Sequence, residues 1–322
     1  MWRYIIRRLI TTFFLLFAIT FIVYCIMELT PGDPVVIKLG TQSSSQELYE
    51  TTKKEMGLDQ PFLTRYFKYV YNAFGQLNLG TSYKGRDVMT EIIARAPRTL
   101  LISTCSILLA TIVGILLGII AAINHGTWKD NSTMLAALLG VSMPDFWFGQ
   151  MLSIIFALQL RWLPPSGFYG PQYLVLPVIT CSLGTLASIA RMTRSSMLEV
   201  IRQDYITTAR AKGQTERNII IHHALKNAMI PIITVVGTSV SYMMGGAMVA
   251  ETVFSVGGIG TLMMDSITNL DHPMVLGGVL CVSAFSCVFV LITDIAYAFV
   301  DPRIRAQYQS SSRKQRKAGA TA

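Results

Sequence analysis

Long apolar stretches alternate with short charged ones along the 322-residue chain. Six stretches contain almost no Lys or Arg: residues 9–29, 99–123, 134–158, 173–190, 229–250 and 276–299. Each has roughly 20 residues, the length that an α-helix needs to cross the apolar core of a bilayer. The pattern therefore predicts an all-α integral membrane protein with six transmembrane helices.

The first span follows a basic opening and so has the outline of a secretory signal. Its apolar core is too long for a signal, and no small-residue cleavage pattern follows it. We therefore expect residues 1–29 to be retained as an N-terminal segment and first membrane helix.

The polar stretch between the first two spans, residues 30–98, is predicted to fold as an external insertion. An amphipathic stretch at 46–56 and an aromatic one at 62–74 favour helices at the membrane surface. The aromatic stretch contains Tyr66, Phe67, Tyr69, Tyr71 and Phe74. Aromatic side chains beside a bilayer are typically interfacial anchors, and we favour that role over a ligand-binding lining.

Composition supports the membrane class, because 52% of the residues are apolar and only 14% are charged, against about 25% in soluble domains. The net charge of +9 is placed as a topology signal, so no nucleic-acid partner is expected. Lys and Arg number three before the first span, one after the second, seven between the fourth and fifth, and six in the basic tail 301–322. The opposite side has only Arg161 in its short loops, so both termini are predicted to be cytoplasmic. We expect the end of the tail to be disordered.

Side chains that could carry chemistry are scattered along the chain. The predicted spans contain Cys25, Cys105, Cys181, Cys281 and Cys287, with no paired or ligand-like spacing. The loops contain His125, His222, His223 and His272. We therefore predict no catalytic residue, no metal site and no bound cofactor, which argues against a membrane enzyme. An ion-coupled secondary transporter is a further alternative, which the scarcity of ionisable groups inside the spans disfavours.

Small residues mark one face of the fifth span, because Gly237, Ser241 and Gly245 recur every fourth residue. Such a face either lets a neighbouring helix approach closely or lines a translocation path, and tight packing is at least as good an interpretation. The second span has the same spacing at Gly114 and Gly118.

Pro144 and Asp145 lie near the middle of the third span, where the proline removes a helical hydrogen bond and the carboxylate enters the apolar layer. Asp145 is therefore a candidate for the translocation path. We favour the simpler interpretation, a kink whose freed carbonyls and carboxylate are satisfied inside the bundle. Near the end of the sixth span, Asp294 is expected to pair with a cation such as Arg191 or Arg194.

Residues 191–228, between the fourth and fifth spans, combine seven basic with three acidic side chains. Helix formers over 197–211, the possible helix stop Gly213 and a start signal at 215–217 predict helix, glycine break, helix. This loop either docks onto a partner or is a solvated basic segment beside anionic lipid, and the physical pattern does not choose between them.

Three segments of this loop carry a resemblance: RMTRSSMLEV at 191–200, DYITTARAKG at 204–213 and HALKNAMIP at 223–231. They closely resemble the coupling loop of the dipeptide, oligopeptide and nickel permease family of binding-protein-dependent ABC importers. Similar markers occur along the rest of the chain: LDQP at 58–61, GTS at 80–82, SMPDFW at 142–147, LPPSG at 163–167 and DPRIR at 301–305.

The resemblance implies a type I ABC importer permease fold with residues 99–300 as its core and a cytoplasmic coupling helix in the 191–228 loop. In related importers this loop has the pattern Glu-Ala-Ala, three residues, Gly, and its helix sits in a groove of the ATPase subunit. The implied coupling residues are Thr207, Thr208, Ala209, Arg210, Ala211, Lys212, Gly213 and Glu216. Thr207 and Thr208 replace the Glu and the first Ala of this pattern, so any contact that depends on the glutamate is not carried over to this chain. Gly257 stands where relatives usually have proline, which leaves the geometry of that turn open.

The resemblance also implies the partners: a homologous second permease, two ATPase subunits that bind ATP and Mg²⁺, an extracytoplasmic solute-binding protein and membrane lipid. No ATP site is predicted in this chain, because the nearest approach to a phosphate loop, 75–82, lacks the lysine. The implied function is import of di- or oligopeptides by alternating access across a bacterial or archaeal cytoplasmic membrane. Nickel, a metallophore or glutathione is the alternative solute, since those importers share most of these markers.

Overall fold

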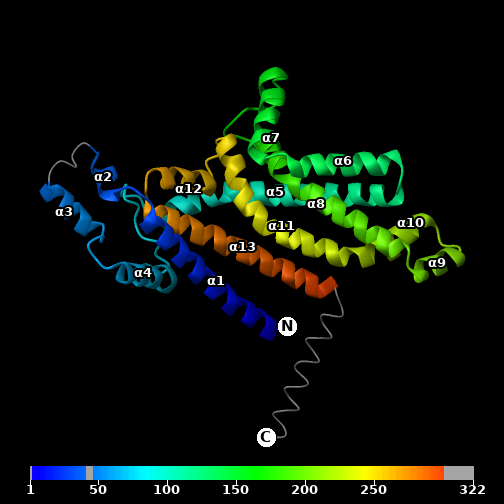
Figure 1. Ribbon diagram of the computed structural model, residues 1–322, viewed down its shortest axis with the longest axis horizontal. Helices are drawn as coiled ribbons and strands as arrows, with labels where there is room; N and C mark the ends of the chain where they lie inside the picture. Colours follow the sequence, from blue (N-terminus) through cyan, green and yellow to red (C-terminus); the bar gives the residue numbers. More distant parts are fainter. Residues whose placement is uncertain (1, 41–45, 301–322) are drawn as a thin grey trace, which may run out of the picture.

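The computed structural model describes residues 2–40 and 46–300, with the backbone alone at 2–5 and 294–300. Five long helices pack side by side along the long axis of the molecule (Figure 1). They are α1 (Trp2–Leu29), α5 (Val88–Ile123), α8 (Val175–Ile201), α11 (Lys226–Val253) and α13 (His272–Val300). All five contain segments long and apolar enough to cross a membrane. The predicted tail, 301–322, lies outside the described residues.

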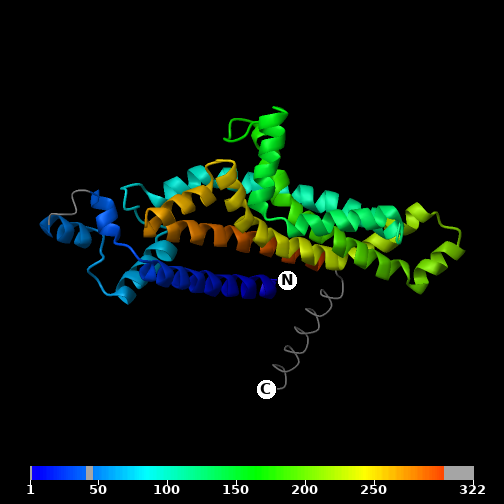
Figure 2. The ribbon, with the colours of Figure 1, turned by 45° about the horizontal axis from the view of Figure 1, so that its top comes forward.

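The third predicted span, 134–158, is two helices rather than one. They are α6 (Trp128–Ser142) and α7 (Asp145–Leu152), the latter continued by a π-helical turn (Ser153–Gln159), and the pair is bent by 107°. The cause is Pro144, whose ring forces Met143 into an extended conformation with ψ of 130°. Figure 2 shows α7 standing away from the other helices. Counting the bent pair as one span confirms the predicted number of six.

Several helices extend beyond the apolar windows that predicted them. The second span was expected at 99–123, but α5 begins at Val88, where the Asp87 carboxylate caps the helix by accepting a hydrogen bond of 2.8 Å from the Thr90 amide. The fourth was expected at 173–190, but α8 continues to Ile201. Hydropathy ends where charged side chains begin, whereas the hydrogen-bonded ladder of a helix continues through them.

Helices α5 and α8 have the most extensive contact in the bundle, and glycines allow them to approach closely. A Cβ atom at Gly114 would lie 2.9 Å from the carbonyl oxygen of Leu186, and one at Gly118 would lie 2.6 Å from that of Ala190. Any larger residue would therefore push the two backbones apart. The predicted packing role of this small-residue pair is confirmed.

The two ends of the bundle carry different additions (Figure 1). At one end, which we call the insertion end, lie α2 (Pro34–Leu39), α3 (Gln46–Glu55) and α4 (Phe62–Val70). At the opposite end, the loop end, lie α9 (Asp204–Ala211) and α10 (Glu216–Asn218). Both the short helices of the 30–98 insertion and the helix, glycine break and helix of the 191–228 loop were predicted, although α8 and α9 divide the 197–211 stretch at Arg202 and Gln203.

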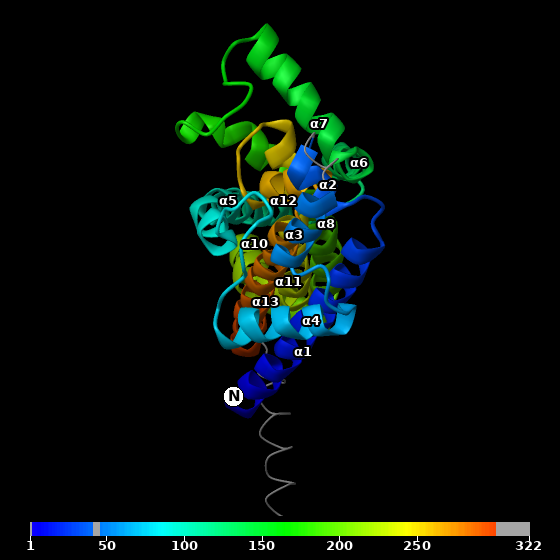
Figure 3. The ribbon, with the colours of Figure 1, turned by 90° about the vertical axis from the view of Figure 1, so that its left-hand side faces the viewer.

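Helix α4, which carries part of the aromatic stretch, lies beside α1 at the insertion end (Figure 3). Tyr66 is 1% exposed, and its ring meets those of Phe21 and Tyr24 edge to face, with centroids 5.1 and 5.5 Å apart. Phe67 and Tyr71 are exposed, in keeping with interfacial anchors. The anchor interpretation therefore suits only part of the stretch, because Tyr66 holds α4 to α1.

A further helix, α12 (Ile259–Thr268), lies between α11 and α13 and was not predicted. The turn that leads into it contains Gly257 with φ of 71°, a left-handed conformation that proline cannot adopt. Arg98 of α5 holds this turn by donating a hydrogen bond of 3.1 Å to the Gly257 carbonyl oxygen. Glycine at position 257 therefore permits a turn that proline could not form.

Candidate functional site: a coupling loop and a membrane cavity

Helix α9 lies at the loop end and connects two spans, because α8 precedes it in the sequence and α10 and α11 follow it. Its apolar face, Ile206 and Ala209, is buried against Met197 of α8 and Ala224 of the π-helical turn that precedes α11. This packing fixes α9 to both spans. A force applied to α9 is therefore passed to α8 and α11.

Most of the predicted coupling residues lie on the outer face of this loop. Ala209 is buried, whereas the other members of the set are exposed: Thr207, Thr208, Arg210, Ala211, Lys212, Gly213 and Glu216. Gly213 has φ of 78°, which confirms the predicted left-handed stop after α9, and a Cβ atom there would meet nothing within 4 Å. The loop thus presents a polar, open surface on a rigidly held helix.

An exposed ion pair closes the loop across Gly213. Arg210 Nε lies 2.7 Å from Glu216 Oε1, and a second contact of 3.3 Å joins Nη2 to Oε2. The carboxylate raises the pKa of the Arg210 guanidinium above its ordinary value, so this side chain stays charged at physiological pH. The two residues that the resemblance placed in one functional set therefore do contact each other.

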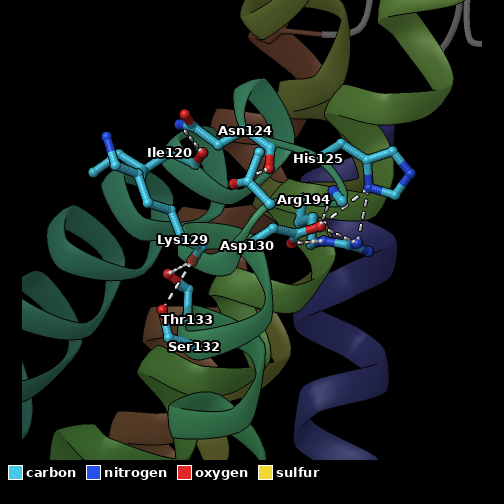
Figure 4. A network of polar contacts seen from close by, with 10 residues as sticks. Ile120, Asn124, His125, Lys129, Asp130, Ser132, Thr133 and Arg194 are labelled. Atoms are coloured by element: carbon cyan, nitrogen blue, oxygen red, sulfur yellow. Dashed lines mark hydrogen bonds and ion pairs between the residues drawn. The ribbon is translucent and has the colours of Figure 1, made fainter.

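A buried ion pair near the loop end joins α6 to α8, as Figure 4 shows. The Asp130 carboxylate is 1% exposed and accepts two hydrogen bonds from Arg194, of 2.5 Å from Nε and 2.7 Å from Nη2. His125 Nδ1 lies 3.1 Å from Asp130 Oδ2, and the Gly126 amide donates to the same oxygen at 3.0 Å. Arg194 is therefore engaged with Asp130, and the predicted pairing of Asp294 with Arg191 or Arg194 stays a prediction. The side chain of Asp294 lies outside the described part of the molecule.

The break between α6 and α7 borders a cavity of about 600 Å³. Its remaining walls come from α8 and α11, the two spans that hold α9. The lining consists of Gly140, Val141, Ser142, Met143, Pro144, Asp145, Gly184, Thr185, Ser188, Thr238, Ser239 and Tyr242. Seven of these residues offer hydroxyl or carboxylate oxygens, so the cavity is polar although it lies between membrane-spanning helices.

The Asp145 carboxylate faces this cavity, and the expectation that the bundle would satisfy it is wrong. Within the described part of the molecule the carboxylate accepts no hydrogen bond and has no ion-pair partner. The position that a Cβ atom would occupy at Gly246 is 4.0 Å from Asp145 Oδ2. Glycine at that point of α11 therefore leaves one side of the carboxylate open.

The small-residue face of α11, formed by Gly237, Ser241 and Gly245, does not line the cavity beside Asp145. Gly237 packs against Thr293 of α13, and together with Ser241 it borders a separate cavity of about 440 Å³ beside Arg8. A Cβ atom at Gly245 would meet nothing within 4 Å. The structure therefore supports helix packing for Gly237 and separates it and Ser241 from Asp145.

A buried carboxylate at the insertion end, Glu251, was not anticipated, because it lies one residue beyond the predicted fifth span. It accepts hydrogen bonds from the Thr99 hydroxyl of α5 and, at 3.2 Å, from the Thr261 amide of α12. The Glu251 side chain thereby ties three helices together. A lone acidic residue directly after an apolar run was the signal that could have found it.

Apolar spans that border a polar cavity, with a short helix exposed on one face at one end, are typical of a multi-pass membrane permease. Comparison with known families agrees: residues 114–306 match the model of the binding-protein-dependent transport system inner membrane component, and residues 1–103 match that of its N-terminal part. The chain therefore belongs to this family of ABC importer permeases, as its resemblance implied.

Curated relatives match over nearly the whole chain. The di/tripeptide transport system permease protein DppB of Pseudomonas aeruginosa is 37% identical over 95% of this chain and 100% of its own length. The dipeptide transport system permease protein DppB of Escherichia coli K12 is 36% identical over 95% and 99%. The glutathione transport system permease protein GsiC of Escherichia coli O6:H1 is also 36% identical over 95% and 99%.

Solved structures share the fold. An inward-facing form of the MetNI methionine ABC transporter aligns with a TM-score of 0.56 and 18% identity, over 66% of this chain and 97% of that chain. A crystal structure of an amino acid ABC transporter with histidines gives a TM-score of 0.50 and 13% identity, over 67% and 94%. The importer permease fold expected from the sequence is therefore confirmed.

Proposed function

We propose that this chain is one of two permease subunits in an ATP-driven importer of di- and oligopeptides. The importer lies in the cytoplasmic membrane of a bacterium or archaeon, with both termini of this chain and the loop end on the cytoplasmic side. Support comes from the family membership, the peptide permeases among the relatives and the concentration of Lys and Arg around the loop end. Glutathione, nickel or a metallophore is the alternative cargo, and one relative is a glutathione permease.

The observation that carries the proposal is the attachment of α9 to two walls of the polar cavity. Two partner ATPase subunits bind ATP and Mg²⁺, and the exposed face of α9 docks onto one of them. Closure of the ATPases moves α9, and α8 and α11 follow because Ile206 and Ala209 are packed against the connected helices. The Asp130–Arg194 pair makes α6 move with α8.

The path for the solute then runs past the break between α6 and α7. A solute-binding protein delivers peptide at the insertion end, and alternating access passes it through the polar cavity beside Asp145. Hydroxyl and carboxylate groups on α6, α7, α8 and α11 replace part of the water around a polar solute. This chain neither binds ATP nor selects its solute alone.

The coupling role is tested at Gly213, the residue that turns the chain after α9. Gly213→Pro should leave the protein in the membrane and abolish both ATPase association and dipeptide uptake, because proline cannot adopt φ of 78°. Gly213→Asn is the matched control, since asparagine tolerates the left-handed region and no atom would meet its Cβ within 4 Å. Co-purification of the ATPases and uptake of a radiolabelled dipeptide measure the outcome. Normal association and uptake in the proline variant would show that the loop is not the coupling element.

A further inference from the structure

We infer that Asp145 is the counter-charge for a positively charged amino group of the solute inside the membrane cavity. The inference rests on the proposed function for the identity of the cargo, a short peptide. The recognition role of Asp145 is argued from a separate observation. That observation is a half-buried carboxylate that has no hydrogen-bond or ion-pair partner among the described residues and lines a cavity of about 600 Å³.

Comparison of three acidic side chains on the bundle shows that Asp145 is exceptional. Asp130 is paired with Arg194, and Glu251 accepts hydrogen bonds from Thr99 and Thr261. Both are buried structural groups whose charge is matched by donors of the chain, as the cost of burying an unpaired carboxylate demands. Asp145 alone of the three faces open volume, where a partner can come from outside the chain.

The cavity favours a cation over an anion. Among the described residues that line it, Asp145 alone carries a formal charge, and it lies in the first turn of α7, where the amide dipoles favour the ionised carboxylate. The hydroxyl groups of Thr185, Ser188 and Ser239 line the same volume and offer oxygen atoms as further acceptors.

A primary ammonium group fits this chemistry. The α-amino group of a peptide has a pKa of about 8 and is therefore largely protonated at neutral pH, and it can donate three hydrogen bonds to oxygen acceptors. A cavity of this size lies in the range of about 300–1,000 Å³ that small-molecule sites occupy. The peptide would pass with its amino end toward Asp145, because the carboxylate would repel its other end.

The charge of the cavity is measured with a thiol placed at Gly184, where a Cβ atom would meet nothing within 4 Å. Gly184→Cys is made in a variant of the full transporter that lacks the native cysteines and is reacted with a cationic and an anionic methanethiosulfonate. Asp145→Asn should lower the ratio of cationic to anionic reaction rates about tenfold, the effect typical of one lost charge-assisted interaction. Asp265→Asn, an exposed acid of α12 outside the cavity, is the matched control and should leave the ratio unchanged. An unchanged ratio in Asp145→Asn, or a thiol that is unreactive in the assembled transporter, would overturn the inference.

Recognition of the ammonium group itself is measured by uptake into proteoliposomes that contain the complete transporter. At equal occupancy of the binding protein, Asp145→Asn should take up dialanine about tenfold more slowly, Asp145→Glu should retain most of the rate, and uptake of N-acetyl-dialanine should not change. Dialanine uptake at the normal rate in Asp145→Asn, or an equal loss for both peptides, would overturn the inference. A wild-type transporter that imports no peptide, combined with a thiol ratio that responds to Asp145→Asn, would refute the peptide cargo and leave the cation preference standing.

Discussion

Asp130 and Asp145 lie on the two halves of the same broken span, and they differ in burial and in the hydrogen-bond donors around them. Asp130 is buried at the loop end, where Arg194 and the Gly126 amide fill its acceptor positions. Asp145 is half buried at the break, where the described residues leave its acceptor positions open. An acidic residue in an apolar span is therefore structural when a neighbouring helix supplies the donors, and available for a ligand when a cavity lies in their place.

The largest expected effect on stability comes from removing the charge of Asp130. Asp130→Asn leaves Arg194 without its counter-charge and should lower the free energy of unfolding by about 3 kcal/mol, the lower end of the cost of breaking a buried pair, because Arg194 remains 25% exposed. Asp145→Asn is the matched control, with an expected change below about 0.5 kcal/mol. Thermal unfolding of the two variants in the same detergent measures the difference. Equal losses would mean that the two carboxylates do not differ in structural role.

A smaller effect is expected when the charge of Arg194 is kept and its geometry is lost. Arg194→Lys preserves the ion pair but cannot donate two parallel hydrogen bonds to Asp130, so we expect a loss of about 1 kcal/mol. The same unfolding measurement tests this variant. A stability equal to that of the unaltered protein would show that the positive charge alone holds α6 to α8.

The smallest effect is expected at the exposed pair of the coupling loop. Arg210 and Glu216 have side chains 44% and 60% exposed, and solvent screens their interaction, so Arg210→Gln should change the free energy of unfolding by less than about 0.5 kcal/mol. Unfolding at low and high salt checks this, since any contribution should vanish at high salt. A loss as large as that of Asp130→Asn would show that the loop is part of the folding core.

Prediction from the sequence was accurate for features that depend on local pattern. Apolar windows located every span, and glycine chemistry located the left-handed turn at Gly213. The helix ends were less predictable, because α5 and α8 continue through charged residues that hydropathy excludes. Pro144 was recognised as a kink, but the size of the bend, 107°, was not predictable, because it also depends on how α6 packs on α5 and α8 and how α7 packs on α8 and α11.

The candidate site was only partly predictable, for reasons that particular residues make clear. The coupling segment is contiguous, so the family resemblance named its residues together, although the Arg210–Glu216 contact was not predicted. Asp130 and Arg194 are separated by 64 residues, and no local signal joins them. Asp145 was noticed because a carboxylate interrupts an apolar run, yet whether donors would surround it depends on side chains of α8 and α11.

The sequence by itself determined the class of the protein, because the length, the hydropathy pattern and the order of motifs are properties of the chain that do not depend on its fold. Six spans, a polar insertion and a charged loop follow from those properties alone. Only the tertiary structure decided which charges are satisfied, because Arg194 reaches Asp130 and Thr99 reaches Glu251 across helix contacts that no pattern along the chain specifies. The same contacts leave Asp145 beside open volume.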